Sequence, residues 1–284
     1  MNHAITHRYA VGYFESWNIE SLQAVLDAAE QSRSPVINGF NGEFLSRPDR
    51  LAHERLVLYG ALGRAAAESS SVPCGFIFNE CPDDGWVRQA VTAGFNLVMP
   101  VPTERETADN YQARVRSMVK YAHEHNVAVE AEIGKLPFGS EVGGEVTDPA
   151  YASDFVQATG IDLLAISAGN VHVLLHGERL LDIERIAAIR EAVEVPLVLH
   201  GGTGISAQSL KQAIGLGVAK VNYGTVLKQR YLEAVRRALE NKQPDPHYLL
   251  GYGGDEDVMV AGRLAVRDAV LEKMDILGCM GKVD

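Results

Sequence analysis

Eight short apolar segments alternate with longer segments of helical periodicity, and this alternation constrains the fold more than any other feature. The apolar segments lie at 11–14, 34–40, 74–79, 95–101, 127–134, 163–169, 196–201 and 219–224. Most of them lack the apolar–polar alternation of half-exposed strands, which indicates strands buried on both faces of a parallel sheet. The segments between them repeat apolar residues at helical spacing, as Leu22, Val25, Leu26 and Ala29 do within 19–31.

The number and spacing of these units predict the architecture. Eight strand–helix units between about residues 10 and 240 favour a closed (β/α)8 barrel of the α/β class over an open doubly wound sheet. From about residue 241 the alternation stops, and a loop precedes a predicted helix near 257–277. No linker-like change in composition interrupts the chain, so we expect one domain over 1–284, with a C-terminal helical extension over about 241–284.

Net charge and cysteine content limit the expected partners and compartment. The formal net charge is −11, which disfavours nucleic acids and anionic membranes as partners. The three cysteines are too few and too scattered for a disulfide framework, and they indicate a reducing compartment. Because the chain has neither a signal-peptide core nor an apolar run of about 18 residues, we expect a cytoplasmic protein.

Polar side chains gather where the predicted strands end. In barrels of this kind the functional residues lie at the carboxyl ends of the strands. The residues at those ends are Asn79, Glu80 and Cys81, then Glu130 and Glu132, Asn170 and His172, His200, and Asn222 and Thr225. Two imidazoles with one or two carboxylates suit a divalent ion such as Zn²⁺, with Mn²⁺, Co²⁺ or Fe²⁺ as alternatives. Either histidine alone could be a structural residue, but their place on adjacent strands favours a shared metal site.

The segment LVLHGGTG at 197–204 carries a second signal. Its glycines Gly201, Gly202 and Gly204 would let backbone N–H groups approach a phosphate closely, and Ser206 is a candidate N-cap for the next helix. The following strand end offers Asn222, Gly224 and Thr225 to the same anion. The same glycines would also serve a plain tight turn, so spacing alone leaves both interpretations open.

Several stretches together resemble the class II, metal-dependent ketose-bisphosphate aldolases of the fructose- and tagatose-bisphosphate type. They are VGYFESWNIESLQAVLDAAEQSRSPV, VTAGFNLVM, VEAEIG, TGIDLLAISAGNVH, PLVLHGGTGI and GVAKVNYGT, and the resemblance runs from about residue 10 to 235. It implies a TIM barrel that forms homodimers or homotetramers, holds a catalytic Zn²⁺ and binds the phosphate of dihydroxyacetone phosphate.

The resemblance also implies roles for individual residues. His172 and His200 match two zinc ligands, and Glu132 matches a carboxylate near or on the metal. Glu141 matches a glutamate on a mobile loop that moves the substrate proton, although this loop differs in length and sequence. The positions that match the phosphate-binding residues are Gly169, Gly201, Thr203, Asn222 and Thr225.

The third predicted strand departs from the family pattern. Where the family has His-Leu-Asp-His-Gly, this chain reads IFNEC, which places Asn79 at the catalytic aspartate and Glu80 at a metal-binding histidine. Asn41 replaces a small serine after the second strand. An asparagine cannot exchange a proton at neutral pH, so Asn79 is left to orient a substrate hydroxyl. A glutamate can still bind a metal, but it favours harder ions such as Mn²⁺ or Mg²⁺.

We therefore expect a metal-dependent aldolase, a lyase of carbohydrate metabolism acting on a phosphorylated ketose. Its reaction would pass through a metal-stabilised enediolate of a unit like dihydroxyacetone phosphate, with Glu141, Glu145 or a water carrying the proton. One alternative is a metal-dependent sugar-phosphate isomerase, epimerase or decarboxylase on the same scaffold. Another is a subunit that binds a sugar phosphate without catalysis.

Overall fold

Eight parallel strands close into a barrel in which each strand pairs with the next and β8 pairs with β1. The computed structural model describes residues 1–137, 144–172, 174 and 177–283. The strands are β1 (Val11–Ser16), β2 (Val36–Asn41), β3 (Cys74–Cys81), β4 (Leu97–Pro100), β5 (Ala128–Ile133), β6 (Leu163–Ile166), β7 (Leu197–Leu199) and β8 (Val218–Tyr223). This topology confirms the predicted (β/α)8 TIM barrel and excludes an open sheet.

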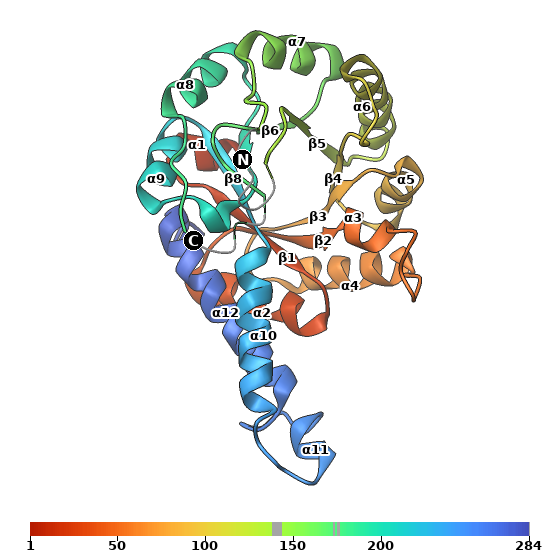
Figure 1. Cartoon of the computed structure of the whole chain (residues 1–284), viewed down its shortest axis with the longest axis vertical. Helices are drawn as coiled ribbons and strands as arrows, with labels where there is room; N and C mark the ends of the chain where they lie inside the picture. The colour runs from red at the N-terminus through yellow and green to blue at the C-terminus, as the bar shows by residue number, and fades with distance from the viewer. Residues whose placement is uncertain (138–143, 173, 175–176, 284) are drawn as a thin grey trace.

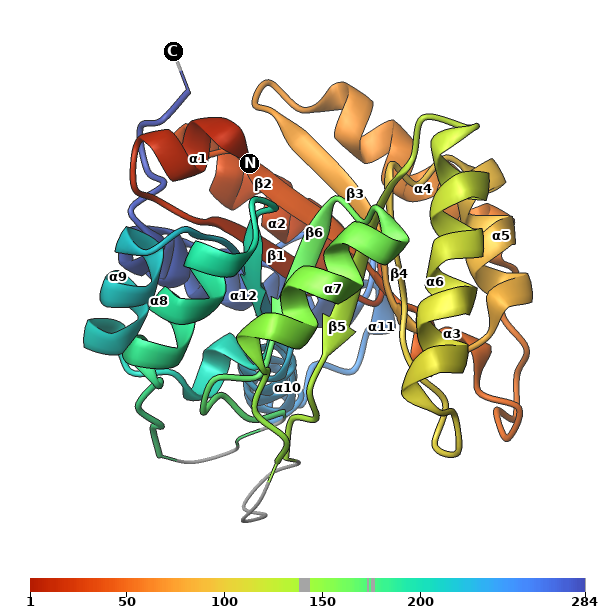
Figure 2. The same ribbon diagram turned by 90° about the horizontal axis from the view of Figure 1, so that it is seen from above.

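Helices surround the barrel on its outside (Figures 1 and 2). The helices described are α1 (Asn2–Thr6), α2 (Ile19–Ser32), α3 (Gly42–Ser46), α4 (Leu56–Ser69), α5 (Asp84–Ala93), α6 (Ala108–His123), α7 (Pro149–Thr159), α8 (Ile183–Ala192), α9 (Ala207–Gly215), α10 (Thr225–Ala238), α11 (Pro246–Leu249) and α12 (Val258–Leu277). A short 3₁₀ turn, η1 (Gly202–Gly204), follows β7.

Local capping signals fix several helix starts. Ser206 precedes α9, and its hydroxyl accepts a hydrogen bond from the Ser209 N–H, as the sequence predicted. Asn18 and Ser21 form a reciprocal capping box at the start of α2. These caps set where each strand-to-helix loop ends, and therefore which residues remain at the mouth of the barrel.

The C-terminal segment forms an arm. Helices α10 and α12 lie against each other and extend beyond the barrel, with α11 near the tip of the arm (Figure 1). Helix α12 lies where the sequence predicted a helix, and it also packs against α2. The preceding segment was predicted to be a loop throughout, but a proline at the first helical position and the Asp245 cap allow the single turn of α11.

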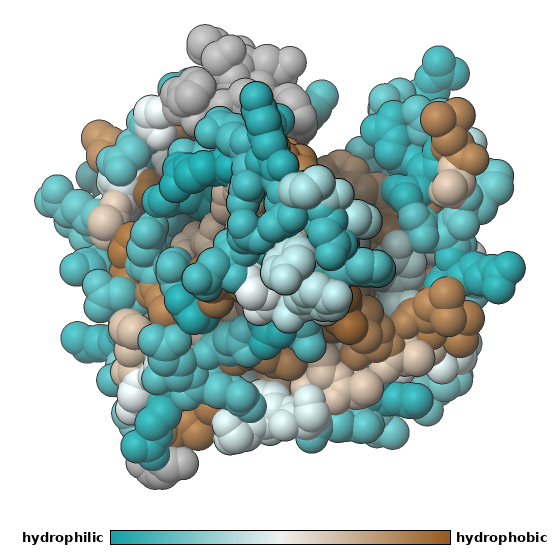
Figure 3. All heavy atoms as spheres, turned by 90° about the horizontal axis from the view of Figure 1, so that it is seen from below, coloured by the Kyte–Doolittle hydropathy of each residue, from teal (hydrophilic) through white to brown (hydrophobic). Residues whose placement is uncertain are grey.

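Hydrophobic and hydrophilic residues are interspersed on the surface. Seen from below, hydrophobic side chains show in separate patches between hydrophilic ones (Figure 3). Within the described part of the chain, no helix is both long and apolar enough to cross a membrane.

Charged side chains are buried in three barrel strands: Glu15 on β1, Glu130 on β5 and Lys220 on β8. Charged side chains are rarely buried without partners, because removing a charge from water costs several kcal/mol. Their presence among apolar strand residues directs attention to the interior of the barrel, near the ends of these strands.

Candidate active site

Four side chains converge at the carboxyl ends of the strands. Glu80 lies on β3, Glu132 on β5, His172 on the loop after β6, and His200 directly follows β7. Each offers one ligand atom, and these four atoms all lie within 4.8 Å of one another. The structure thus brings together the four residues that the sequence suggested as metal ligands.

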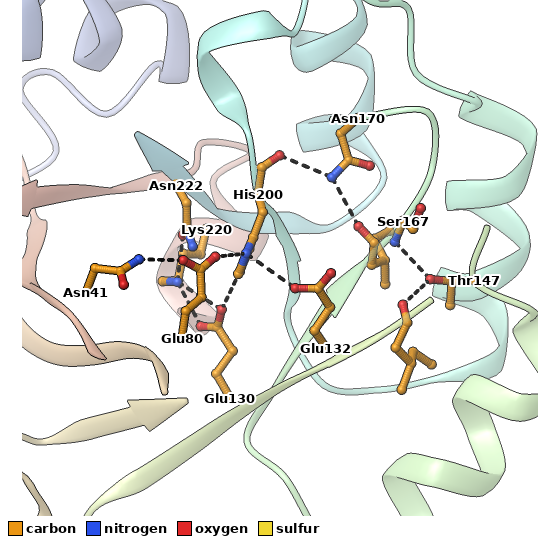
Figure 4. A network of polar contacts seen from close by, with 12 residues as sticks. Asn41, Glu80, Glu130, Glu132, Thr147, Ser167, Asn170, His200, Lys220 and Asn222 are labelled. Carbon is orange, nitrogen blue, oxygen red and sulfur yellow. Dashed lines mark hydrogen bonds and ion pairs between the residues drawn. The ribbon is translucent and has the colours of Figure 1, made fainter. Parts of the chain in front are cut away.

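The His200 imidazole is held between carboxylates (Figure 4). Its Nδ1 lies 2.7 Å from Glu80 Oε1 and 3.5 Å from Glu132 Oε2, while its Nε2 lies 3.1 Å from Glu130 Oε1. The ring is 1% exposed. Nδ1 thus faces the two carboxylates of the cluster, the position of a nitrogen that would donate its electron pair to a metal. The N–H on the opposite side of a metal-bound imidazole is usually donated to a carboxylate, as Glu130 would accept it here.

Glu80 reaches this position through a local distortion of β3. The pairing of β3 with β4 shifts register between Phe78 and Cys81, and Glu80 adopts a left-handed backbone with φ of 53°. A non-glycine residue in this conformation costs about 1 kcal/mol or more, and such strain is concentrated at functional sites. Asn41 Nδ2 donates a 2.7 Å hydrogen bond to Glu80 Oε2, so Asn41 positions this carboxylate.

Electrostatics favour the charged form of Glu80. Burial alone would raise its pKa, but the hydrogen bond and charge of His200 outweigh burial and lower the pKa to about 2. In turn, burial would lower the pKa of His200, and its carboxylate neighbours, first Glu130 and then Glu80, raise it to about 10. For Glu132 burial prevails over the two histidines, and its pKa is raised.

Lys220 is a central member of the network that the sequence reasoning missed. Its Nζ lies 2.8 Å from Glu130 Oε2 and donates a 2.7 Å hydrogen bond to Asn222 Oδ1. Burial opposes the charge of Glu130, but Lys220 and His200 outweigh it and lower the pKa of Glu130. The available signal was a charged residue of opposite sign inside each of two largely apolar strands, Glu130 on β5 and Lys220 on β8, which compensate each other across the barrel interior.

Asn170 supports the same centre from the loop after β6. Its Nδ2 donates a 3.1 Å hydrogen bond to the backbone carbonyl of His200 (Figure 4). Its Oδ1 accepts a 2.8 Å hydrogen bond from the Ala168 N–H. Asn170 therefore ties the loop after β6, which carries His172, to the backbone at His200. The sequence placed it at a strand end without assigning it this function.

The loops after β7 and β8 form an edge of the site. Gly201 has a φ of 66°, and a Cβ atom there would lie 1.9 Å from the carbonyl oxygen of Val171. Thr203 Oγ1 accepts a 3.4 Å hydrogen bond from the Val226 N–H in the first turn of α10, which begins at Thr225. The structure thus places Thr203 next to the N-terminus of a helix, where an anion is favoured.

Asn222 and Gly169 complete the set that the resemblance assigned to phosphate binding. Asn222 Oδ1 is occupied by Lys220, while its buried Nδ2 has no hydrogen-bond partner among the residues described. Such a donor is available to a ligand. Gly169 lies in the loop after β6 with a φ of 91°.

The remaining candidates differ in their surroundings. Asn79 is 2% exposed, and its Oδ1 has no partner within the described chain. Cys81 is buried, and burial raises the pKa of its thiol to about 12, which fits a packing residue. Glu141 lies outside the described residues.

Comparisons with known proteins show the family. The family model for class II fructose-bisphosphate aldolase matches residues 1–282. The fructose-bisphosphate aldolase of Geobacillus stearothermophilus is 35% identical over 291 aligned residues, covering 99% of this chain and 96% of that protein.

Solved structures give the same result. The crystal structure of the YdjI aldolase from Escherichia coli K12 has a TM-score of 0.82 at 31% identity, covering all of this chain and 96% of that one. A putative fructose-1,6-bisphosphate aldolase from Coccidioides immitis has a TM-score of 0.83 at 27% identity, covering 99% and 95% of the two chains. The chain therefore belongs to the class II fructose-bisphosphate aldolase family, whose members are lyases.

Proposed function

We propose that this protein is a metal-dependent aldolase that breaks or forms a carbon–carbon bond in a phosphorylated ketose. The observation that carries the proposal is the convergence of Glu80, Glu132, His172 and His200 within 4.8 Å. This cluster lies at the same end of the barrel as the glycine-containing loops after β7 and β8. A metal beside an anion-binding edge suits a substrate that carries both a carbonyl and a phosphate.

The chemistry of the donor set fits a divalent cation. His172, His200 and Glu80 would hold it, with Glu132 as a further ligand, and two nitrogens with carboxylate oxygens suit Zn²⁺ most closely. Mn²⁺, Co²⁺ and Mg²⁺ are the alternatives, because the second carboxylate makes the site harder and less positive. When bound, such an ion supplies positive charge against the negative charge that develops on the substrate oxygens.

The phosphate of a dihydroxyacetone-phosphate-like unit would bind at the β7–β8 edge. Backbone N–H groups at Gly201 and Thr203, the Nδ2 of Asn222 and the N-terminus of α10 at Thr225 are the proposed donors. Gly169, on the neighbouring loop, is proposed to leave space for the same group. This end of the substrate would then be fixed while its carbonyl faces the cluster.

Cleavage and condensation both require a group that transfers a proton to or from the carbon next to the substrate carbonyl. Asn79 cannot do so, and we assign it a hydrogen bond to a substrate hydroxyl. Glu132 is a suitable carrier among the described residues, because its carboxylate lies within the cluster and burial raises its pKa. Glu141 is the alternative that the resemblance suggests. A Glu132→Gln variant that binds metal normally but loses turnover would identify Glu132 as the carrier.

One observation favours a second candidate function. Asn79 cannot serve the aldehyde half of an aldol reaction as an acid, whereas the metal and phosphate residues needed to form an enediolate are present. An isomerase, epimerase or decarboxylase acting on a sugar phosphate would need only the metal-binding and phosphate-binding residues.

A direct assay separates these functions. The purified protein, loaded with Zn²⁺ or Mn²⁺, is given a panel of ketose phosphates, and released dihydroxyacetone phosphate is measured with a coupled dehydrogenase. We expect release that stops on chelation and falls at least about a hundredfold in His200→Ala. Conversion of a ketose phosphate into an isomer without release would support the second candidate. Release that is insensitive to both chelation and His200→Ala would contradict the proposal.

A further inference from the structure

A cavity of about 140 Å³ lies at the carboxyl ends of β1 and β2, beside the candidate metal cluster. Aromatic side chains form much of its wall: Trp17, Phe40, Phe44 and Tyr59. Asn41 also lines the cavity, and it donates the 2.7 Å hydrogen bond to Glu80. A molecule in the cavity would therefore be separated from Glu80 of the metal cluster by the Asn41 side chain.

The first cation in the cavity wall is already neutralised. Lys228 Nζ lies 2.5 Å from Glu15 Oε1 and 4.3 Å from the centre of the Phe44 ring. Glu15 is a buried residue, and Lys228 is partly exposed. Since its ammonium has a carboxylate and a ring face as partners, Lys228 offers little uncompensated charge to an incoming anion.

The second cation is engaged in the same way. Arg50 forms an ion pair with Glu54, and it donates hydrogen bonds to the carbonyl oxygens of Phe44 at 2.9 Å and Ala52 at 3.2 Å. Glu54 also accepts a 2.7 Å hydrogen bond from the Tyr59 hydroxyl. Guanidinium recognition of phosphate depends on a free pair of N–H groups, and most of those of Arg50 are used within the protein.

These contacts give the cavity a definite chemical character. Its two carboxylates balance its two cations, so a phosphate dianion entering it would meet like charge at Glu15 and Glu54. Carboxylate, amide and hydroxyl groups suit the hydroxyls of a small polyol, and the aromatic faces suit its C–H groups. A cavity of this volume holds a molecule of about six non-hydrogen atoms, which is the size of glyceraldehyde.

We propose that this cavity binds the aldehyde half of the substrate and selects an uncharged, hydroxylated aldehyde of about three carbons over its phosphate ester. The inference rests on the proposed aldolase function and adds the class of the second substrate. In the condensation, C3 of dihydroxyacetone phosphate loses a proton and bonds to the aldehyde carbon, and the aldehyde oxygen gains a proton. No oxidant or reductant is required.

The test compares two aldehydes. Condensation of dihydroxyacetone phosphate with glyceraldehyde and with glyceraldehyde 3-phosphate is measured as kcat/KM on the metal-loaded protein. We expect a preference of at least about tenfold for glyceraldehyde, because like charge in the cavity disfavours the phosphate ester. An equal or reversed preference, or no reaction with glyceraldehyde, overturns the inference.

Two variants test the electrostatic cause. Glu54→Gln removes the carboxylate partner of Arg50 and should shift the ratio of the two kcat/KM values about tenfold towards the phosphate ester. Asp49→Asn is the matched control, because it makes the same change in charge in the exposed Arg47–Asp49 pair of the same loop. It should leave the ratio unchanged within about twofold. Equal shifts in both variants, or none in Glu54→Gln, would contradict a role for the cavity.

Exchange of the C3 protons of dihydroxyacetone phosphate with D₂O, without any aldehyde, separates this inference from the proposed function. Exchange together with a preference for the phosphate ester would overturn the inference and leave the aldolase proposal standing. If exchange and condensation are both absent, the proposed function fails, and the inference fails with it.

Discussion

The ammonium of Lys220 lies 2.8 Å from Oε2 of Glu130 inside the barrel, and both side chains are fully buried. Oε1 of the same carboxylate lies 3.1 Å from Nε2 of His200. Lys220 thus compensates the charge of the carboxylate that orients a proposed metal ligand. The ion pair thus supports the Nε2 side of the His200 ring, whereas Glu80 faces its Nδ1.

Replacing Lys220 with methionine should destabilise the protein strongly. The variant leaves the buried Glu130 carboxylate without its lysine partner, and breaking a buried pair costs about 3–5 kcal/mol. Urea unfolding of the metal-free protein measures the loss. The double variant Lys220→Met/Glu130→Gln removes both charges and should recover most of it. A single variant within about 1 kcal/mol of the parent would contradict a structural role for the pair.

Glu130→Gln should weaken metal binding while leaving the proposed ligands in place. A glutamine is a poorer acceptor for the His200 N–H, and loss of such a supporting carboxylate typically costs about 10–100-fold in metal affinity. Competition with a chromophoric chelator gives the affinity. Glu106→Gln is a suitable control, because Glu106 pairs with Arg114 and is not one of the four clustered side chains. Equal metal affinities in Glu130→Gln and the parent would show that Glu130 does not support metal binding.

Gly201→Ala should impair phosphate binding through the backbone. The new Cβ would lie 1.9 Å from the Val171 carbonyl oxygen, so the loop after β7 must move. We expect at least a tenfold weaker affinity for dihydroxyacetone phosphate, measured by calorimetry. Gly253→Ala is the matched control, because Gly253 has a similar φ of 69° but open space around its Cβ position. A similar loss of affinity in both variants would argue against a specific role for Gly201.

Asp257 gives a prediction about pH. Its carboxylate caps α12 and accepts hydrogen bonds from the backbone N–H groups of Gly251, Gly253, Met259 and Val260. Burial would raise its pKa, but these four hydrogen bonds outweigh burial and lower it below the ordinary 3.8. A lowered pKa means that the carboxylate stabilises the fold above pH 3.8 and loses this effect as the pH falls through the folded-state pKa.

Asp257→Ala should therefore lower Tm at pH 7 by roughly 2–4 °C, the effect of about 1 kcal/mol from a lost cap. The difference in Tm between the parent and the variant should shrink as the pH falls below 3.8 and through the folded-state pKa. A difference that stays constant over this range would show that the charge of Asp257 does not contribute.

The barrel was predictable because each strand and helix carried its own local pattern. Apolar runs bounded by caps such as Ser206 gave the order of elements, and the rule for parallel barrels then placed His172, His200, Glu80 and Glu132 at one end. The role of Lys220 was not predictable in the same way. Its partner Glu130 is 90 residues away in the sequence, and only closure of the barrel brings the two together.

Local backbone geometry was the other feature that could not be predicted from the sequence. Nothing in the sequence IFNEC indicated that Glu80 adopts a left-handed conformation, since glutamate rarely does so. The register shift between Phe78 and Cys81 that accompanies it depends on pairing with β4. The expected homodimer or homotetramer, the cytoplasmic location and the roles of the individual site residues stay predictions.

The most direct test of the central claim is exchange of the C3 protons of dihydroxyacetone phosphate in D₂O, followed by NMR with and without a chelator. Metal at the Glu80–His172–His200 cluster together with phosphate at the β7–β8 edge predicts rapid exchange that chelation abolishes and that Zn²⁺ or Mn²⁺ restores. Absence of exchange in protein shown to contain metal, or exchange that persists after the metal is removed, would contradict the account.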